Sequence, residues 1–297
     1  MSWKFAYDSP TAITKLLEVH GLSMSKKFGQ NFLLSRQVRE HIVDEMKIDD
    51  SMKVWEIGPG IGSLTAHLLE AGCMVTAFEI DHGFCRILSD EAFGDDENFR
   101  LIEGDALKTW EKLFKVEGTP DRICGNLPYN VGSVCIAKLI EGKCLPQKMV
   151  YTLQKEVADR LCAQPGDKEW SSFTLLAQMD YVVKSAFSIN SGAFYPVPNV
   201  TSSVITMDKR EKPLVDPSLR DLFLMVIRDL FAQRRKTVKN NLLSGKTGAI
   251  IGKQGVDDVL ESSGVLPGKR AEQLDWAQFI AISEAISNYR AKNLSDN

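Results

Sequence analysis

The chain has 297 residues, 44% of them hydrophobic, which is enough for one large and one small domain that each bury a core. Its net charge of −3 gives no overall sign of nucleic-acid binding, so any such function needs a local basic surface. Because the sequence has no run of about 20 apolar residues and no leader pattern, we expect no membrane association and a cytoplasmic location.

A short leading helix is expected first, because Ser9 precedes a proline at the first helical position and Gly21 follows the apolar residues. From Lys53 to about Met207, β-rich runs then alternate with helical ones. The expected strands are "KVWEI", "MVTAFEI", "FRLIEG", "DRICGN", "KMVYTL", "DYVVKSAFSI" and "SSVITM". This alternation predicts an α/β fold with a parallel, doubly wound, Rossmann-like sheet, whose ligands bind beyond the carboxyl ends of the strands.

The pattern changes after "DKREKPLVDPS", because the remaining sequence contains helical runs and no convincing strand. We place a boundary near Lys209–Pro217 and predict two domains, residues 1–208 and a small all-helical domain of residues 209–297.

The cysteines are widely spaced, with no C-x-x-C pair and no pair of histidines nearby. This spacing fits neither a zinc site nor a disulfide framework, so reduced thiols and no bound metal are expected. The six are Cys73, Cys85, Cys124, Cys135, Cys144 and Cys162.

The first expected strand runs directly into "EIGPGIGSLT", where Gly58, Gly60 and Gly62 form the turn toward a helix. Glycines there let the backbone approach a ligand and leave amide groups at a helix N-terminus facing it. Nicotinamide and flavin enzymes use a similar turn, but the dinucleotide spacing G-x-G-x-x-G is absent because residue 63 is Ser.

Two acidic residues follow the next strands. Glu79 ends the second strand, as expected for a carboxylate that binds ribose hydroxyls, and Asp105 follows the third. A carboxylate at the second position can accept a hydrogen bond from an adenine amino group, which suits one adenosine moiety such as that of S-adenosylmethionine. The alternative is that Asp105 only caps the helix that follows.

The stretch "GNLPYN" lies after the fourth strand, at the edge where a substrate would meet the cofactor. The adenine amine is a poor nucleophile until its lone pair localises on nitrogen, and two acceptors directed at its N–H groups favour that form. The Asn126 side chain and the Leu127 carbonyl are plausible acceptors, Pro128 fixes the bend, and Tyr129 offers a face for a flipped base. An ordinary turn with an Asn cap and a buried Tyr is the alternative.

With these features the sequence resembles the ribosomal RNA adenine N6,N6-dimethyltransferase family, whose members act on two adjacent adenosines near the 3′ end of small-subunit RNA. The resemblance covers nearly the whole chain. It rests on "KKFGQNFL", "EIGPGIGSLT", "FEID", "EGDAL", "GNLPYN", "LQKEVADRL", "FYPVPNVTSSV", "LFAQRRKTVKNNL" and "RAEQL".

The resemblance implies a class I S-adenosylmethionine-dependent methyltransferase with a helical RNA-positioning domain, acting in ribosome biogenesis. It implies catalysis at Asn126, Leu127, Pro128 and Tyr129, with Phe194 as a second aromatic wall of the base pocket. The implied cofactor contacts are Gln30, Asn31, Phe32, Leu33, the Glu56–Gly62 loop with Glu56, Gly58, Gly60 and Gly62, and Glu79, Ile80, Asp105, Ala106 and Asn126.

A local basic surface is expected in "LFLMVIRDLFAQRRKTVKNNL", where apolar residues at helical spacing define one buried face. On a continuous helix, Arg235, Lys236 and Lys239 project away from that face, while Arg234 lies nearer its edge and can pair across the domain junction. With Lys26 and Lys27 near the pocket, these are the predicted RNA contacts. A solvated charged face is the alternative interpretation.

Some positions depart from the family's usual pattern. Ser171 and Ser172 replace a Gly-Arg pair, and Asn199 and Thr201 stand where Lys and Asp are common. The loss of positive charge at these positions affects the predicted RNA-binding surface more than the predicted methyl-transfer chemistry.

The expected partner is small-subunit RNA in a pre-assembled subunit, bound by a monomer. Two alternatives remain. One is the related large-subunit methyltransferase of macrolide resistance, against which "GNLPY" and "RRKTVKNNL" argue. The other is a non-catalytic RNA-binding assembly factor or transcription factor on the same fold.

Overall fold

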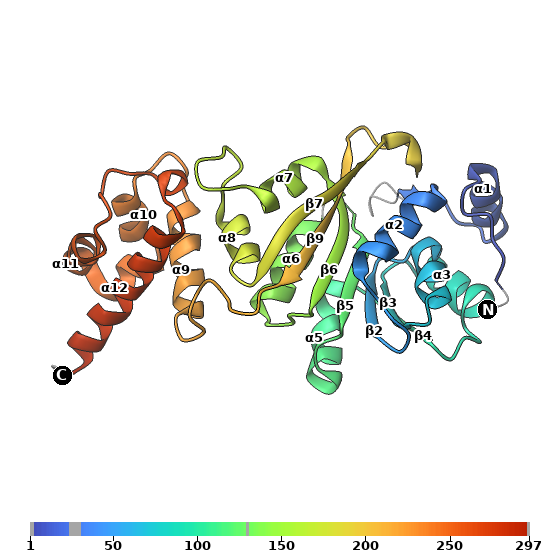
Figure 1. The fold of residues 1–297 in the computed structure, drawn as a ribbon, viewed down its shortest axis with the longest axis horizontal. Coiled ribbons are helices and arrows are strands. Elements are labelled where there is room, and N and C mark those ends of the chain that lie inside the picture. The colour runs from blue at the N-terminus through green and yellow to red at the C-terminus, as the bar shows by residue number, and fades with distance from the viewer. Residues whose placement is uncertain (1–2, 24–30, 129–130, 296–297) are drawn as a thin grey trace. The chain divides into compact units, whose positions relative to one another are not determined.

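The computed structural model describes residues 3–23, 31–128 and 131–295 (Figure 1). The chain forms two compact units, the first made of residues 1–158 and 182–209, the second of residues 159–181 and 210–297. The longer segment of the second unit begins at residue 210. The second unit also includes residues 159–181, which the sequence analysis placed in the first domain.

The first unit contains a seven-stranded sheet in the order β4-β3-β2-β5-β6-β9-β7 (Figure 1). Neighbouring strands from β4 to β6 are parallel, and β9 runs antiparallel to β6. The strands are β2 (Lys53–Ile57), β3 (Met74–Glu79), β4 (Phe99–Glu103), β5 (Arg122–Asn126), β6 (Lys148–Gln154), β7 (Tyr181–Ile189) and β9 (Ser202–Lys209). The predicted α/β class is confirmed, and the strand order reverses between β2 and β5, where such sheets bind ligands.

A second, two-stranded sheet joins distant parts of the first unit. Strand β1 (Phe32–Leu33) pairs antiparallel with β8 (Phe194–Tyr195), so that Leu33 faces Phe194. Both strands are short, and their side chains pack into the core of the first unit. The pairing connects Phe32 and Leu33 to Phe194 and Tyr195 across about half of the chain.

In the described residues, seven α-helices belong to the first unit or begin in it. They are α1 (Pro10–Val19), α2 (Arg36–Met46), α3 (Ser63–Glu70), α4 (His82–Arg86), α5 (Ala106–Glu117), α6 (Gly132–Glu141) and α7 (Lys155–Cys162). Helix α1 begins as expected, because the Ser9 hydroxyl accepts a hydrogen bond from the amide of Ala12 at 3.2 Å. Helix α4 continues as a π-helical turn over Ile87–Ala92.

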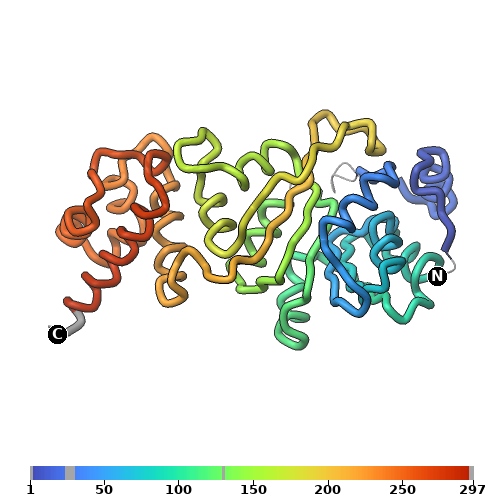
Figure 2. The backbone as a smooth tube through the Cα atoms, viewed as in Figure 1, coloured from blue at the N-terminus to red at the C-terminus, as the bar shows by residue number. Residues whose placement is uncertain are grey.

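The second unit is helical, and its backbone can be followed in Figure 2. Its helices are α8 (Ser172–Gln178), α9 (Arg220–Phe231), α10 (Val238–Ser244), α11 (Lys246–Ser263) and α12 (Trp276–Ser295). Stacked aromatic pairs join α9 to α12: Phe223 packs on Trp276 and Phe231 on Phe279. In the described part of the chain, no helix is long and apolar enough to cross a membrane.

Residues 159–181 join the second unit through buried polar bonds. The Arg220 guanidinium makes two hydrogen bonds to the Asp180 carboxylate, at 2.7 and 2.8 Å, and both side chains are almost fully buried. The Trp170 indole donates to the Leu274 carbonyl at 3.1 Å. These partners are far apart in sequence, which explains why the strand–helix alternation placed this segment in the first domain.

Candidate active site and cofactor pocket

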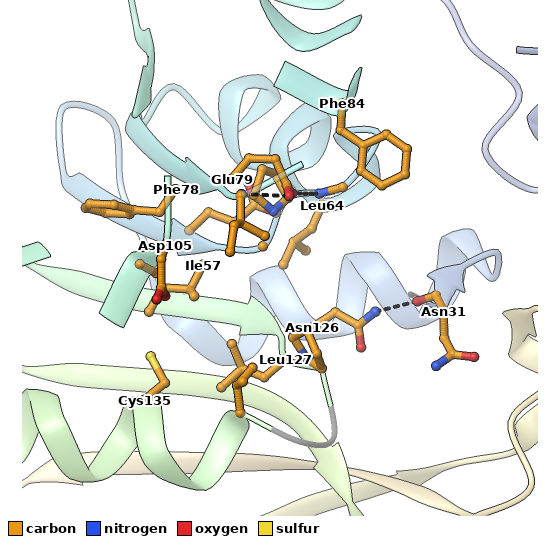
Figure 3. Close-up of a pocket in the computed structure, with 18 of the residues that line it drawn as sticks. Asn31, Ile57, Leu64, Phe78, Glu79, Phe84, Asp105, Asn126, Leu127 and Cys135 are labelled. Carbon is orange, nitrogen blue, oxygen red and sulfur yellow. Dashed lines mark hydrogen bonds between the residues drawn. The ribbon is translucent and has the colours of Figure 1, made fainter. Parts of the chain in front are cut away.

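A pocket opens where β2, β3, β4 and β5 reach their carboxyl ends (Figure 3). Each of these strands contributes residues at or just after its last position. Among the predicted residues, the pocket is lined by Asn31, Phe32, Leu33, Glu56, Gly58, Gly60, Glu79, Ile80, Asp105, Ala106, Asn126, Leu127 and Pro128. One cavity therefore gathers two sets of residues, those assigned to the cofactor and those assigned to catalysis.

The glycine turn brings the backbone to the pocket wall. Gly60 has a φ of 59°, and a Cβ atom there would lie 3.3 Å from the Phe32 ring. Gly62 is not among the residues that line the pocket, and it caps α3 with a φ of 85°. A Cβ atom on Gly62 would come within 2.5 Å of the Phe93 ring, so packing requires a glycine here, and its cofactor contact stays a prediction.

Glu79 is tied to the glycine turn by its own carboxylate. One oxygen accepts the amide of Gly60 at 3.0 Å, and the other accepts those of Ile80 and Asp81 at 2.9 and 2.8 Å. Burial raises the pKa of Glu79 to about 7, although these three bonds oppose that shift. A carboxylate has about four acceptor sites, so the described residues leave one unused on the oxygen that faces Gly60, suited to a ligand hydroxyl.

Glu56 is a second buried acid in the pocket wall. It is 2% exposed, and its carboxylate accepts a hydrogen bond from the Thr65 hydroxyl at 2.6 Å. Burial raises its pKa to about 7, with the nearby charge of Glu79 adding to the shift. Two acids of raised pKa in one pocket are typical of a site that receives a polar or cationic ligand.

Asp105 caps a helix and also lines the pocket. Its carboxylate accepts the amide of Leu107 at 3.0 Å and so caps α5. The residue also lines the pocket, beside Ala106 and Leu107. A short acid at a helix N-terminus can cap with one oxygen and receive a ligand N–H with the other.

Asn126 ends β5, and its amide nitrogen donates to the Asn31 carbonyl at 2.8 Å (Figure 3). The figure shows the amide oxygen turned away from Asn31. Leu127 continues the sheet by donating its amide to the Thr152 carbonyl at 3.2 Å, and its side chain is 1% exposed. The Pro128 carbonyl accepts the amides of Val131 and Gly132 at the start of α6, which anchors both sides of the "NLP" bend.

The structure does not bring every predicted residue to the pocket. Phe194 is 1% exposed, packs in the core beside Leu33 and is not among the residues that line the pocket. Its role as an aromatic wall stays a prediction. Four predicted residues lie outside the described ranges: Gln30, Tyr129, Lys26 and Lys27.

The sequence analysis missed several lining residues. Phe84 and Leu107 come from the first turns of helices that follow β3 and β4, and Cys135 comes from α6. Their signal is positional, because an apolar residue in the first turn after a strand faces the same edge as the strand end. Ser63, Leu64, Phe78, Gly104 and Val131 complete the missed set, whereas Ile57 and Pro59 belong to the Glu56–Gly62 loop that was expected to contact the cofactor.

The segment that carries the predicted basic residues does not form one continuous helix. Helix α9 ends at Phe231, and residues 232–237 form a turn before α10. The Asn241 amide shapes this turn by donating to the carbonyls of Leu230 and Gln233, at 2.7 and 3.1 Å. A continuous helix through this region was therefore the wrong expectation.

The predicted basic residues differ in their surroundings. Arg235 and Lys236 lie exposed on the turn, whereas Lys239 on α10 pairs with Asp257 of α11. Arg234 bonds to the Lys168 carbonyl and to Glu272, so it serves the packing of the second unit. Ser171 caps α8 through a bond from the Thr174 amide, which gives this departure from the family pattern a structural role.

The residues present fit S-adenosylmethionine. Glu79 has a free acceptor site for ribose hydroxyls, Asp105 can receive an adenine N–H, and Phe84, Ile80 and Leu107 provide apolar walls for a purine. The strand order and a pocket of this construction define a class I S-adenosylmethionine-dependent methyltransferase.

Comparison with known proteins narrows the class. Residues 21–288 match the family described as Ribosomal RNA adenine dimethylase, and the chain belongs to this family. It is 40% identical to Ribosomal RNA small subunit methyltransferase A of Treponema denticola, over 95% of this chain and 96% of that protein. The protein of the same name from Borreliella afzelii is 37% identical, over 97% and 98% of the two chains. The chain is thus an enzyme of the adenine-methylating class that acts on ribosomal RNA.

Solved structures agree with this assignment. A dimethyladenosine transferase from Plasmodium falciparum superposes with a TM-score of 0.72 at 25% identity, over 86% of this chain and 97% of that one. The 23S rRNA methyltransferase ErmE, at 22% identity and a TM-score of 0.62, shares the fold over 86% of this chain and 99% of its own.

Proposed function

We propose that this protein transfers methyl groups from S-adenosylmethionine to the N6 atoms of two adjacent adenosines near the 3′ end of small-subunit ribosomal RNA. Two observations favour the small subunit over the large one. The relatives that match at 37–40% identity over nearly their whole length bear the small-subunit name. The second is the "GNLPY" form of the catalytic stretch. Acting on ribosomal subunits, the enzyme would work in the cytoplasm.

The observation that carries the catalytic proposal is the bond from Asn126 to the Asn31 carbonyl. It uses one amide N–H as a donor, and so leaves the amide oxygen available as an acceptor at the end of β5. With the Leu127 carbonyl, this oxygen would receive the two N–H groups of a flipped adenine. That arrangement turns the nitrogen lone pair out of the ring and toward the methyl donor.

The bound cofactor supplies a methyl carbon on a positively charged sulfur. The adenine nitrogen held by Asn126 and Leu127 would accept this methyl group through its lone pair, and the cofactor would leave as a neutral thioether. The methylated nitrogen would then lose its extra proton to water. A neutral asparagine suits this step, because an amide oxygen can stabilise the N–H groups as they become more acidic without binding their proton beforehand.

The second unit would position the RNA through the exposed turn that carries Arg235 and Lys236. Contacts between such side chains and phosphates supply affinity that falls with salt. A monomer bound to a pre-assembled small subunit is the partner arrangement that we infer. The RNA's folded shape would then select the two adenosines.

Methyl transfer from labelled S-adenosylmethionine separates the candidate functions. We expect the protein to label small subunits that lack the dimethyladenosines, and to leave large subunits unlabelled. Label on 23S RNA instead would support the large-subunit alternative. Binding to small subunits without any label would support a non-catalytic assembly factor.

A further inference from the structure

Arg39 on α2 is a buried arginine beside the cofactor pocket. Its side chain is 4% exposed, and one terminal nitrogen donates to the carbonyls of Leu33, at 2.9 Å, and of Leu34. The Nε atom donates to the His67 ring at 3.2 Å, and the guanidinium lies over the Tyr7 ring. Among the residues that the structure describes, Arg39 forms no ion pair with a carboxylate.

A buried guanidinium without an ion pair is an expensive way to fill a core position. Its charge loses hydration, and the acceptors of its hydrogen bonds are neutral, while the carboxylates of Asp8 and Glu40 act on it only from a distance. Burial accordingly lowers the pKa of Arg39. A methionine of similar length would fill the space without that cost, so packing alone does not explain the residue.

The acceptors that Arg39 binds belong to the segment that forms the pocket wall. Phe32 and Leu33 line the pocket, and the Phe32 ring packs against Gly60 of the glycine turn and edge-on against Phe84. Just before them, the Asn31 carbonyl receives the amide of Asn126. Strand β1 has only two residues, so its pairing with β8 fixes this segment weakly by itself.

The bond to His67 orients the guanidinium. Burial and the charge of Arg39 lower the pKa of His67, so its ring is neutral near pH 7. The neutral ring accepts from Arg39 at Nε2, and the proton on Nδ1 is donated to Glu70 at 3.2 Å. Arg39 is thereby anchored to α3, which begins directly after the glycine turn.

We propose that Arg39 is a positioning residue for methyl transfer. By binding two consecutive carbonyls at β1, it sets the Asn31 carbonyl, and through it the Asn126 amide and the Phe32 side of the cofactor pocket. The inference rests on the proposed function only for its kinetic part, because the cofactor affinity can be measured without RNA.

The test compares Arg39→Met with Arg36→Met. Arg36 lies on the same helix, is exposed, and pairs with Glu40 of that helix, so its loss removes the same charge without touching β1. Arg39→Lys keeps the charge and can still reach the carbonyls, which covers the case in which the methionine variant does not fold. Full-length proteins are first matched for folded fraction by urea unfolding.

Three measurements follow on each variant: hydrogen exchange of a peptide covering residues 31–35, calorimetric affinity for S-adenosylmethionine, and the single-turnover rate on under-methylated small subunits at saturating cofactor. For Arg39→Met we expect roughly tenfold faster exchange at 31–35, weaker cofactor binding of similar size and a slower transfer step. RNA affinity should stay unchanged. Arg39→Lys should recover part of each loss, and Arg36→Met should behave as the parent.

Two results would overturn the proposal. One is a folded Arg39→Met protein with parent exchange, cofactor affinity and transfer rate. The other is a loss of global stability in both Arg39 variants, with cofactor affinity and rate per folded molecule unchanged, which would show that Arg39 serves only the core. If the parent itself transfers no methyl group, the proposed function fails, while exchange and cofactor affinity still decide the role of Arg39.

Discussion

The side-chain amide of Asn126 donates a hydrogen bond to the backbone carbonyl of Asn31, 2.8 Å away and 95 residues earlier in the chain. This bond joins the end of β5 to the segment that enters β1, and so joins the catalytic stretch to the cofactor wall. The bond also fixes the orientation of the Asn126 side-chain amide, because its nitrogen faces the Asn31 carbonyl. Within the described residues the amide oxygen has no hydrogen-bond partner, and an oxygen open to the substrate is what the proposed chemistry requires.

Replacing Glu79 should weaken cofactor binding without abolishing the fold. Its carboxylate has one acceptor site left after three backbone bonds, and a lost hydrogen bond to a charged group costs about 1–3 kcal/mol. Glu79→Ala should therefore bind S-adenosylmethionine about 5- to 150-fold more weakly by calorimetry. A folded variant with parent affinity would refute the assignment of Glu79 to the cofactor.

The two roles of Asp105 can be separated by two substitutions. Asp105→Asn keeps a good helix cap, so its stability should stay close to that of the parent, while the charged acceptor for an adenine amine is lost. Asp105→Ala should lose the cap as well, with a further cost of about 1 kcal/mol in the free energy of unfolding. Calorimetry for the cofactor and urea unfolding check the pair. Equal cofactor affinity in Asp105→Asn and the parent would leave Asp105 as a cap alone.

Glu56 should make the cofactor-free protein less stable as the pH rises. Its pKa is raised from an ordinary value of 4.5 to about 7 by burial, so its contribution is fully present below about pH 4.5 and is lost as the pH rises through about 7. Glu56→Gln cannot ionise and still offers Thr65 an oxygen. Between pH 5 and 8, the stability difference should shift toward the variant by about 2–3 kcal/mol. Urea unfolding that gives a constant difference would show that Glu56 ionises normally.

The exposed turn of the second unit should bind RNA phosphates. Removing Arg235 and Lys236 together should lower the slope of log affinity against log salt by roughly 0.7–0.9 for each phosphate that the variant no longer binds. Lys239→Ala should have a smaller effect, because Lys239 already pairs with Asp257. Lys115→Ala, an exposed lysine on α5, is the matched control. Filter binding at several salt concentrations measures the slopes, and an unchanged slope in the double variant would make this turn a solvated surface only.

Sequence patterns predicted the sheet and the acids at its edge for a simple reason. Glu79 and Asp105 stand directly after strands whose β-rich composition is local, and strand ends of a parallel sheet meet at one edge. The glycine turn was predicted in the same way. Asn126 was placed there too, although its partner Asn31 was not foreseen, because that contact spans distant parts of the chain.

The features that the sequence did not predict depend on contacts between distant residues. A glycine is required at position 62 because the Phe93 ring leaves no room for a Cβ atom. Phe194 is buried because β1 pairs with β8. The end of α9 depends on Asn241, which takes the carbonyls that a continuing helix would have used. Residues 159–181 group with the helical unit through Asp180 and Arg220. Helical spacing and strand alternation contain no information on such partners.

Asn126→Ala measures the central claim most directly. Removing one preorganised group that acts in the transition state typically costs about 3–4 kcal/mol of barrier, a loss of about 10²–10³-fold in rate. Cofactor and RNA affinity should stay near those of the parent, and the second methylation should suffer more, because a monomethylated amine has a single N–H left to share between two acceptors. Single-turnover reactions on under-methylated small subunits, with mass spectrometry of the RNA, resolve unmodified, mono- and dimethylated adenosine. We expect Asn126→Ala to yield a trace of monomethyladenosine and almost no dimethyladenosine, whereas dimethyladenosine formed at the parent rate would contradict the role of the Asn126 amide in methyl transfer.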